Sequence, residues 1–376
     1  MKTYLATLMG NPLSGADADN SRTAPSPSVH DRYNGMISEE EYLVLLADRD
    51  THSKGPGTIV RHPVIRARDA DARSRAAGMA ASRFRTSARA ASSDAPPLVV
   101  PFTKMQGLGN DYVYVEEFKK PVSDPSALAM AVSDRHFGVG GDGLVLIGFS
   151  KTADFRMRIF NADGSEAEMC GNAARCVGKY VFEKGLISRP SFSLETLAGI
   201  RGIRLELKGR TVDRVRVDMG KPNLVPSSLP MLADGNSFIN REIPVNGKLY
   251  RATAVSMGNP HLVVPFFGID SLNLPLIGPA FEKHPLFPRG VNTEFIEVRD
   301  RNRIRMRVWE RGSGETLACG TGACASLVAC ALNGLTEYKA TVELPGGELA
   351  VEWDAQGIVH MTGPASFVFS GEYYIA

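Results

Sequence analysis

The chain has 376 residues and a formal net charge of +2, with 43% hydrophobic and 22% charged residues. This length and composition are typical of a core-forming globular protein of about two domains. The nearly balanced charge gives no general reason to expect a nucleic-acid partner, and no apolar run reaches the roughly 18 residues that a membrane helix needs, so we expect neither nucleic acid nor membrane binding.

The cysteines argue against two further classes of protein. Five cysteines in a chain of this length are too few, and too irregularly spaced, for the disulfide framework of a small secreted domain. The spacing of Cys170 and Cys176 is not that of a zinc site, so no metal is expected. We therefore predict that the protein works in a reducing compartment and that individual free thiols have specific roles.

Residues 1–97 differ in composition from the rest of the chain. They are rich in Ala, Ser, Arg and Asp and poor in aromatic residues, so we expect a disordered extension. Residues 73–93 carry five Arg and several Ser with no acidic residue, which is typical of an organelle transit peptide. If the segment is a transit peptide, we expect the protein in the plastid (chloroplast) stroma. The alternative is that the segment is a solvated linker, in which case we expect a cytoplasmic protein. Met79 is a second candidate for the start of translation.

The remaining chain contains a duplication. "DFRMRIFNADGSEAEMCGNAARC" and "RIRMRVWERGSGETLACGTGAC" share their order of features, and Cys319 follows Cys170 by 149 positions (319 minus 170). Other pairs with this spacing are Arg156 and Arg305, Asn110 and Asn259, and Gly143 and Asn292, the last with weak local similarity. Landmarks in one register indicate two copies of a unit of about 100 to 150 residues.

Each copy mixes strands with a helix. The alternating runs "RVRVDMG", "FRMRIF", "RIRMRV" and "TVELPGGELAVEW" predict strands. The segments that follow Cys170 and Cys319 predict helices that end at glycine. The expected fold is α+β, with domains at 98–222 (completed by 364–376) and 223–363.

A thiol at the start of a helix meets amides that have no partner inside the helix and the positive end of the helix dipole. Both effects predict a lowered cysteine pKa, and a following glycine lets a ligand approach the backbone. With the two copies facing each other, backbone amides could hold one carboxylate between the two thiols; they belong to Gly171, Asn172, Gly320 and Thr321. One thiolate would then remove a proton from a tetrahedral carbon while the opposite thiol returns one to the other face, without metal or cofactor.

The alternatives for the cysteines are structural. A lone Cys-Gly at a helix start is more often a small buried residue, and the pair Cys170 and Cys319 is also close enough in this picture to oxidise to a disulfide. The duplication favours the catalytic interpretation, because two matched cysteines beside glycine and polar residues are hard to explain by packing. Cys176, Cys324 and Cys330 fall inside the helices and are predicted to be core.

The motifs "GLGNDY", "FNADGSEAEMCGNAARC", "MGNPH", "GVNTEF" and "ERGSGETLACGTGA" closely resemble those of diaminopimelate epimerase, from about Phe102 to the C-terminus. The resemblance implies interconversion of LL- and meso-diaminopimelate in lysine biosynthesis by Cys170 and Cys319, without pyridoxal phosphate. It also implies two pseudo-symmetric domains, each a curled mixed β-sheet around a central helix, with the site in a cleft between them, and a homodimer.

The resemblance implies roles for polar residues as well. Asn110 matches the family asparagine near the reacting carboxylate. Five residues match those that bind the distal ammonium and carboxylate: Asn161, Asn259, Asn292, Glu310 and Arg311. Each asparagine taken singly is more often a turn former, and Glu310 with Arg311 could be a surface ion pair. His261 either orients a thiol or satisfies a loop. Some relatives carry glutamine where this chain has Gly143, which puts a role for that position in doubt.

Two other functions stay open at this point. A proline-type racemase uses similar cysteine elements, but its cyclic monocarboxylate substrate has no use for Glu310, Arg311 and the asparagines. An inactive binding module of the same fold is the alternative from another class, and the presence of both thiols and the polar cluster argues against it.

Overall fold

The structure is a computed structural model that describes residues 98–375. The predictions of a disordered extension and a transit peptide fall on residues 1–97 and so lie outside the described residues. Residues 101–373 belong to one compact unit. In the part of the chain that is described, no helix is both long and apolar enough to cross a membrane.

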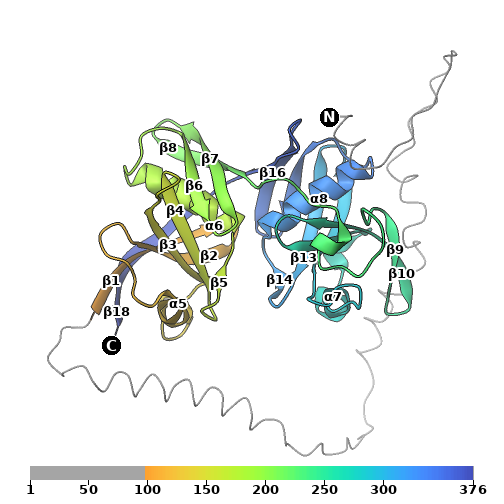
Figure 1. Ribbon diagram of the computed structural model, residues 1–376, viewed down its shortest axis with the longest axis horizontal. Coiled ribbons are helices and arrows are strands. Elements are labelled where there is room, and N and C mark those ends of the chain that lie inside the picture. The colour runs from red at the N-terminus through yellow and green to blue at the C-terminus, as the bar shows by residue number, and fades with distance from the viewer. Residues whose placement is uncertain (1–97, 376) are drawn as a thin grey trace, which may run out of the picture. The chain divides into compact units, whose positions relative to one another are not determined.

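The described chain contains one series of elements twice (Figure 1). The first copy comprises β1(Leu98–Gly107), β2(Asn110–Glu116), α5(Pro125–Ser133), β3(Gly143–Phe149), β4(Phe155–Asn161), β5(Glu166–Ala167), α6(Gly171–Glu183), β6(Ser191–Thr196), β7(Gly199–Lys208) and β8(Thr211–Asp218). The second comprises β10(Lys248–Ser256), β11(Pro260–Pro265), α7(Leu274–Glu282), β12(Asn292–Asp300), β13(Arg303–Glu310), β14(Gly314–Thr316), α8(Gly320–Leu332), β15(Lys339–Leu344), β16(Gly347–Trp353) and β17(Val359–Gly363). Outside this series lie η3(Pro226–Ser228), β9(Arg241–Val245), η4(Ile269–Ser271) and β18(Ser366–Ile375).

The strand pairing confirms the predicted α+β duplication. In each copy the second strand pairs in parallel with the third, β2 with β3 and β11 with β12, and the third pairs in antiparallel with the fourth. A second parallel pair follows in both copies, β4 with β6 and β13 with β15. Both α6 and α8 begin 149 positions apart and end 149 positions apart, so the offset found in the sequence also relates the two helices.

The two long helices start and stop in the same way. Cys170 and Cys319 are the N-cap residues, with extended backbone angles, which confirms the prediction that the Cys-Gly elements open helices. Gly185 and Gly334 follow the helix ends with positive φ, a conformation that a residue without a Cβ adopts at little cost. The amides of the next residues, Leu186 and Leu335, donate to carbonyls in the last helical turn and so satisfy the exposed helix ends.

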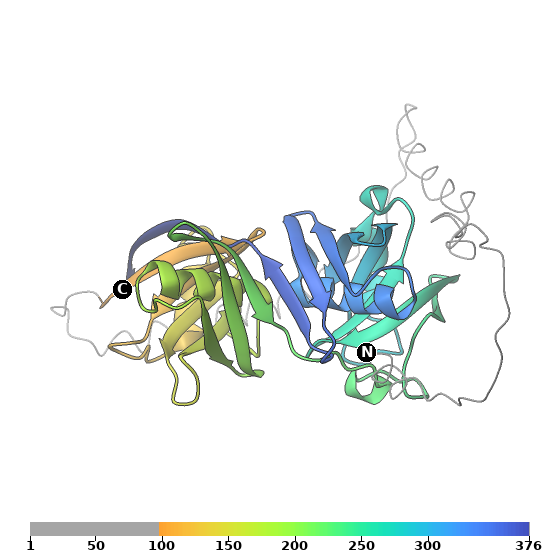
Figure 2. The same cartoon turned by 90° about the horizontal axis from the view of Figure 1, so that it is seen from above.

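Each long helix is the centre of its copy. Of the 13 residues of α8, 11 are buried, including Leu327 and Val328, which leaves no wide face for solvent. Helix α6 buries 10 of its 13 residues, among them Val177 and Val181. Figure 2 shows the strands of each copy curving around its helix. Full burial of one such aliphatic side chain stabilises the fold by about 1.5–3 kcal/mol, so these helices anchor their N-cap cysteines firmly.

Two strand pairings connect segments that are far apart in sequence. β17 pairs in antiparallel with β8, with Gly363 opposite Val215. β18 then pairs with β1. A hydrogen bond of 3.1 Å between the hydroxyls of Thr103 and Ser370 marks that contact, and the rings of Phe102 and Phe369 meet edge to face nearby. The last strand of the chain therefore completes the sheet of the first copy.

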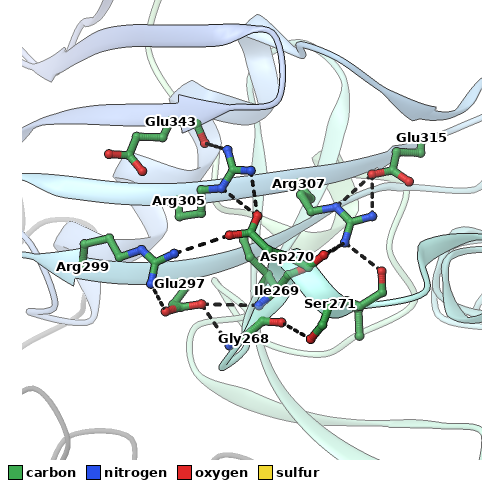
Figure 3. A network of polar contacts seen from close by, with 11 residues as sticks. Gly268, Ile269, Asp270, Ser271, Glu297, Arg299, Arg305, Arg307, Glu315 and Glu343 are labelled. Atoms are coloured by element: carbon green, nitrogen blue, oxygen red, sulfur yellow. Dashed lines mark hydrogen bonds and ion pairs between the residues drawn. The ribbon is translucent and has the colours of Figure 1, made fainter. Parts of the chain in front are cut away.

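A polar network fixes the turn η4 onto β12 and β13 (Figure 3). The buried carboxylate of Glu297 accepts hydrogen bonds from the amides of Gly268 and Ile269 at 2.9 and 3.3 Å. On β13, Arg305 binds Asp270 at 2.7 Å, and Arg307 donates to the Ile269 carbonyl at 2.6 Å. The network holds in place the strand that ends at Glu310.

Candidate active site

Two thiols occupy equivalent places in the two copies. Cys170 has φ −135° and ψ 118°, Cys319 has φ −117° and ψ 108°, and each precedes a 13-residue helix. Cys170 is half-buried and Cys319 is 5% exposed. Neither side chain forms a capping hydrogen bond with its own helix. The thiols are therefore not engaged as structural caps.

The starts of the two helices contact each other. The buried amide Nδ2 of Asn172, in the first turn of α6, donates to the carbonyl oxygen of Ala318 at 3.2 Å. Ala318 directly precedes Cys319 in the chain. The structure thus brings together the two motifs that the sequence analysis paired.

One methionine of β17 explains both glycines of the repeated Cys-Gly element in physical terms. A Cβ on Gly171 would lie 2.7 Å from Met361 Cε, and a Cβ on Gly320 would lie 3.0 Å from Met361 Sδ. Both distances are shorter than ordinary contacts between carbon or sulfur atoms. Close packing on Met361 therefore favours glycine at both positions, because any larger residue would require the Met361 side chain to shift, in addition to any approach by a ligand.

Backbone amides are available at both helix starts. The first hydrogen bonds within the helices run from the Ala174 amide to the Cys170 carbonyl and from the Ala323 amide to the Cys319 carbonyl. The amides of the preceding residues therefore have no acceptor inside their own helix, as at any helix N-terminus. They include the four predicted to hold a carboxylate, those of Gly171, Asn172, Gly320 and Thr321.

The predicted lowering of the cysteine pKa is wrong. Burial raises the pKa of the Cys170 thiol, although the amides of Asn172 and Ala173 and the charge of Arg175 act in the opposite direction. Burial also raises the pKa of the Cys319 thiol, by more, and the nearby carboxylates of Glu310 and Glu294 add to the effect. Removal of water from a thiolate outweighs what one helix terminus supplies.

Cys170 faces polar side chains of the first copy. Its Sγ lies 3.5 Å from Oδ1 of Asn110, whose Nδ2 donates to Asp142 at 2.7 Å. Asp142 thus fixes the orientation of Asn110 and leaves its carbonyl oxygen toward the thiol. The phenol of Tyr112 also lies beside Cys170, and burial, followed by the charge of a Cys170 thiolate, raises the pKa of that phenol.

Cys319 ends a hydrogen-bonded series of side chains in the second copy. Its Sγ lies 3.5 Å from Oγ1 of Thr321, which accepts from Nδ2 of Asn259 at 3.4 Å. Oδ1 of Asn259 meets Nε2 of His261 at 2.9 Å, and Nδ1 of His261 meets Oε1 of Glu294 at 2.7 Å. His261 and Glu294 are fully buried. His261 was predicted either to orient a thiol or to satisfy a loop. It contacts Asn259, which donates to the Thr321 hydroxyl beside Cys319, so it is linked to the thiol through two side chains.

The charge of Glu310 acts on both thiols. Its carboxylate accepts a short hydrogen bond from the hydroxyl of Thr316, and burial raises its pKa, while the contact with Cys319 lowers it. The charge of Glu310 in turn raises the pKa of Cys170 and of Cys319. This acid is the side chain that both halves of the candidate site share.

Arg311 and Asn292 are joined through the backbone. Oδ1 of the buried Asn292 accepts from the Arg311 amide at 2.9 Å, and its Nδ2 donates to the Pro260 carbonyl at 3.1 Å. The Arg311 side chain is exposed and donates to the Arg289 carbonyl at 3.2 Å. Among the ion pairs of residues 98–375 none joins Glu310 to Arg311, so the two do not form the surface pair considered above.

Asn161 and Gly143 are neighbours across β3 and β4. Nδ2 of Asn161 donates to the Ser165 hydroxyl at 3.0 Å, within the turn that follows β4. A Cβ at position 143 would lie 2.1 Å from the carbonyl oxygen of Phe160. The backbone here leaves no room for a glutamine, which explains why position 143 contributes no side chain.

The other thiols belong to the core, as predicted. Cys176, Cys324 and Cys330 are fully buried inside α6 and α8, and none of the five thiols is in a disulfide. Within residues 98–375 no group of three or more His, Cys, Asp or Glu side chains is arranged to hold a metal ion. A surface pocket lined by Arg251, Asn333 and other residues lies at the end of α8 remote from Cys319.

Several residues of the site escaped the sequence analysis. Tyr112 lies inside the motif "GLGNDY", and Asp142 directly precedes Gly143, so proximity to residues already considered was a signal that could have found both. Glu294 lies within "GVNTEF" two positions after Asn292. Arg175 likewise lies inside "FNADGSEAEMCGNAARC", five positions after Cys170. Met361 carried no such signal, because its importance arises from burial between segments distant in sequence.

Comparison with known proteins identifies the family. The family model for diaminopimelate epimerase matches residues 102–225 and 253–368. A diaminopimelate epimerase of Desulfovibrio desulfuricans is 58% identical over 281 residues, covering 73% of this chain and 98% of the relative. One of Acetivibrio thermocellus is 56% identical over 272 residues, covering 72% and 97%.

A solved structure shares the fold. A hydroxyproline epimerase from Agrobacterium vitis has a TM-score of 0.53 at 16% sequence identity, covering 73% of this chain and 91% of that one. At this identity the likeness concerns the fold alone, and it agrees with the duplicated α+β architecture. The sequence relatives are far more similar, and on their evidence this chain belongs to the diaminopimelate epimerase family.

Proposed function

We propose that this protein is an isomerase that interconverts LL- and meso-diaminopimelate, a step of lysine biosynthesis, with Cys170 and Cys319 as its acid and base. The observation that carries the proposal is the pair of equivalent N-cap thiols whose helix starts are joined by the bond from Asn172 to the Ala318 carbonyl. Membership of the diaminopimelate epimerase family supports the choice of substrate.

The proton transfers balance without any other reactant. A thiolate takes the α-proton of the reacting carbon, and the electron pair of the broken C–H bond stays on that carbon and its carboxylate. The opposite thiol then donates its proton to the other face of the carbon. One turnover inverts the centre and exchanges the protonation states of the two thiols. The original thiolate and thiol must therefore be restored before the enzyme can convert a second molecule of the same isomer.

Backbone amides supply the stabilisation that this reaction needs. The carboxylate of the reacting end gains negative charge as the proton leaves. Donors and dipoles already aimed at such a group stabilise the transition state, and each lost donor costs about 2.7–4 kcal/mol in comparable sites. In this proposal the amides of Gly171 and Asn172 act from α6, and those of Gly320 and Thr321 act from α8.

The distal end of the substrate would be bound by the remaining polar residues. Arg311 is exposed and forms one hydrogen bond to a carbonyl, so its planar guanidinium has donors left for a carboxylate. Glu310 can accept from the ammonium group. Asn161 forms one side-chain hydrogen bond, and Asn259 and Asn292 form two each. Because a side-chain amide has two donors and two acceptor positions, all three keep capacity for a substrate.

The first test is proton NMR of purified, reduced protein mixed with LL-diaminopimelate in heavy water. We expect loss of the α-proton signal together with the appearance of the meso isomer, and no exchange with proline. A folded protein with free thiols that exchanges neither compound would overturn the proposal.

The variant Arg311→Met separates this function from a proline-type racemase. Loss of the distal carboxylate partner should raise KM for diaminopimelate by about tenfold or more, since hydrogen bonds to charged groups contribute about 1.5–3 kcal/mol. For a monocarboxylate substrate the same change should be nearly silent. An unchanged KM for diaminopimelate would remove Arg311 from the binding site.

We also propose that the enzyme acts as a homodimer in a plastid. The homodimer rests on the resemblance to the family, and the compartment on the Arg- and Ser-rich composition of residues 73–93. Light scattering on the purified protein tests the first; a single-chain mass at micromolar concentration would reject it.

A further inference from the structure

The duplicated site is unequal in charge. Arg175 on α6 corresponds, 149 positions on, to the uncharged Cys324 on α8. Conversely, Glu294 and Glu310 of the second copy correspond to Val145 and Asn161 of the first. At these positions the first copy contributes a cation and the second contributes two acids, although the backbones around the two thiols match. The first copy also holds Asp142, opposite Val291, but this acid contacts Cys170 only through Asn110.

Arg175 is a buried cation without a carboxylate partner. Its side chain is fully buried, and its Nη2 has no hydrogen-bond partner among the described residues. Its other nitrogens donate to the Pro364 carbonyl at 3.0 Å and to Oδ1 of Asn172 at 2.9 Å. A guanidinium in this environment lacks the counter-charge that normally offsets the loss of water.

The position of Arg175 near the start of α6 makes this lack more costly. A cation near a helix N-terminus is disfavoured by the helix dipole. The groups whose ionised forms would compensate it are all neutral acids: the thiols of Cys170, Cys176 and Cys324 and the phenol of Tyr114. Of these, only Cys170 is half-buried rather than fully enclosed, and it is the one that the proposed reaction ionises.

The surroundings of the two active thiols differ accordingly. Cys170 faces Arg175 from α6, the neutral phenol of Tyr112 from β2 and the acid Glu310 from β13. Cys319 faces Glu310 from β13 and Glu294 from β12, the latter paired with His261 from β11. Burial raises the pKa of both thiols, and more strongly that of Cys319.

We propose that Arg175 is a positioning residue that makes the two thiols unequal: in the enzyme awaiting substrate, its buried charge and its hold on Asn172 favour the thiolate at Cys170 and leave Cys319 as the thiol. This inference rests on the proposed two-thiol reaction and adds its starting state. The enzyme is then ready for the substrate isomer whose α-proton faces Cys170. To act on the other isomer, whose α-proton faces Cys319, the enzyme must first move the proton of Cys319 to Cys170.

The test is alkylation of the full-length reduced protein by iodoacetamide across pH 6 to 10.5, with the modification of each cysteine followed by peptide mass spectrometry. The pH midpoint of the rate is compared, because the absolute rate also depends on access. We expect the midpoint of Cys170 to lie below that of Cys319. A midpoint of Cys319 equal to or below that of Cys170 in the unaltered protein overturns the inference, whether or not the protein epimerises diaminopimelate.

Three variants separate charge from packing. Arg175→Met should raise the Cys170 midpoint, and its alkylation at pH 8 should slow about tenfold for each pH unit by which that midpoint rises, with a smaller change at Cys319. Arg175→Lys keeps the charge and should retain Cys170 as the more acidic thiol. Asn172→Ala removes the acceptor but not the charge, so it should lower kcat with little effect on the order of the midpoints.

Each variant is first checked for native circular dichroism and a cooperative thermal transition. A folded Arg175→Met protein with unchanged midpoints overturns the role of the charge. If that variant does not fold, Arg175→Lys decides, since reversal of the midpoints despite the retained charge contradicts the inference. Failure of epimerisation with the midpoints ordered as expected would instead count against the proposed function.

Discussion

The two N-cap cysteines have the same local geometry but different surroundings. Cys170 contacts Asn110, which Asp142 orients, whereas Cys319 contacts Thr321 at the end of the series that leads to Glu294. Two thiols that act on opposite faces of one carbon need not be alike, because each must give up a proton in one direction and supply it in the other. What both need is a fixed position, which their buried helices provide.

Replacement of either cysteine by alanine should abolish most of the turnover. Loss of an acid or a base typically costs about 10²–10⁴-fold, and here one proton transfer loses its only partner. Steady-state rates in both directions measure the effect, with Cys330→Ala as the control because that thiol is fully buried in α8 and outside the site. Near-normal rates in Cys170→Ala or Cys319→Ala would exclude the two-thiol mechanism.

Sequence patterns predicted the positions of the two cysteines but not their chemistry. The repeat around Cys170 and Cys319 was visible because an offset of 149 positions preserves the motifs. The direction of their pKa shifts was predicted wrongly, since burial cannot be read from a helix start alone. Asn172 and Asn292 were found as candidates, but their side chains bind backbone carbonyls across the fold, which no local pattern indicates.

At the scale of elements, the interiors of the long helices make the fold sensitive to alkali. Burial raises the pKa of Cys176 to about 11 and that of Cys324 to about 12. Because these folded-state values exceed the unfolded value of about 8.5, their contribution to stability is fully present below that pH and is lost as pH rises toward 11 to 12.

We therefore expect the free energy of unfolding to fall above about pH 8.5, by about 1.4 kcal/mol per pH unit for each such thiol. Urea denaturation under reducing conditions at pH 7 to 10 measures the slope. Cys176→Ala should lower the starting stability but flatten the decline. The same slope with and without this thiol would show that other groups cause the loss.

The network of Figure 3 yields a second prediction for an element, the turn η4. Glu297 is buried and accepts from two amides of the turn, so Glu297→Ala should cost about 1–3 kcal/mol by leaving those donors unsatisfied. Asp270 has a half-exposed side chain, and Asp270→Asn should cost less than about 1 kcal/mol despite its bonds to Arg305. Thermal and urea unfolding measure the loss of stability in each variant. Equal losses in Glu297→Ala and Asp270→Asn would contradict this ranking.

For the whole molecule, the α+β duplication followed from the sequence because both copies keep the spacing of strands, turns and helix. α5 and α7, which were not predicted, also begin 149 positions apart at Pro125 and Leu274. Neither helix is strongly amphipathic over its short length, so periodicity gave little signal. The pairing of β8 with β17 joins residues about 150 positions apart, and such contacts cannot be inferred from local patterns.

Residues 1–97 give a prediction for the intact chain in the cell. A fusion of residues 1–100 to a fluorescent protein should enter an organelle, because the Arg- and Ser-rich segment lacks acidic residues. A fusion that begins at Met79 tests whether the shorter segment suffices. Diffuse cytosolic fluorescence of both fusions would leave the segment as a linker, and would not bear on the activity of residues 98–376.

The return of β18 to β1 has a consequence for how the protein is made. Thr103 and its partner Ser370 are 267 positions apart. At roughly 5–20 residues per second a ribosome needs on the order of 13–53 s to synthesise the intervening chain. The first copy, although translated first, cannot close its sheet until β18 has been synthesised, so the nascent chain exposes an unpaired strand edge throughout that interval.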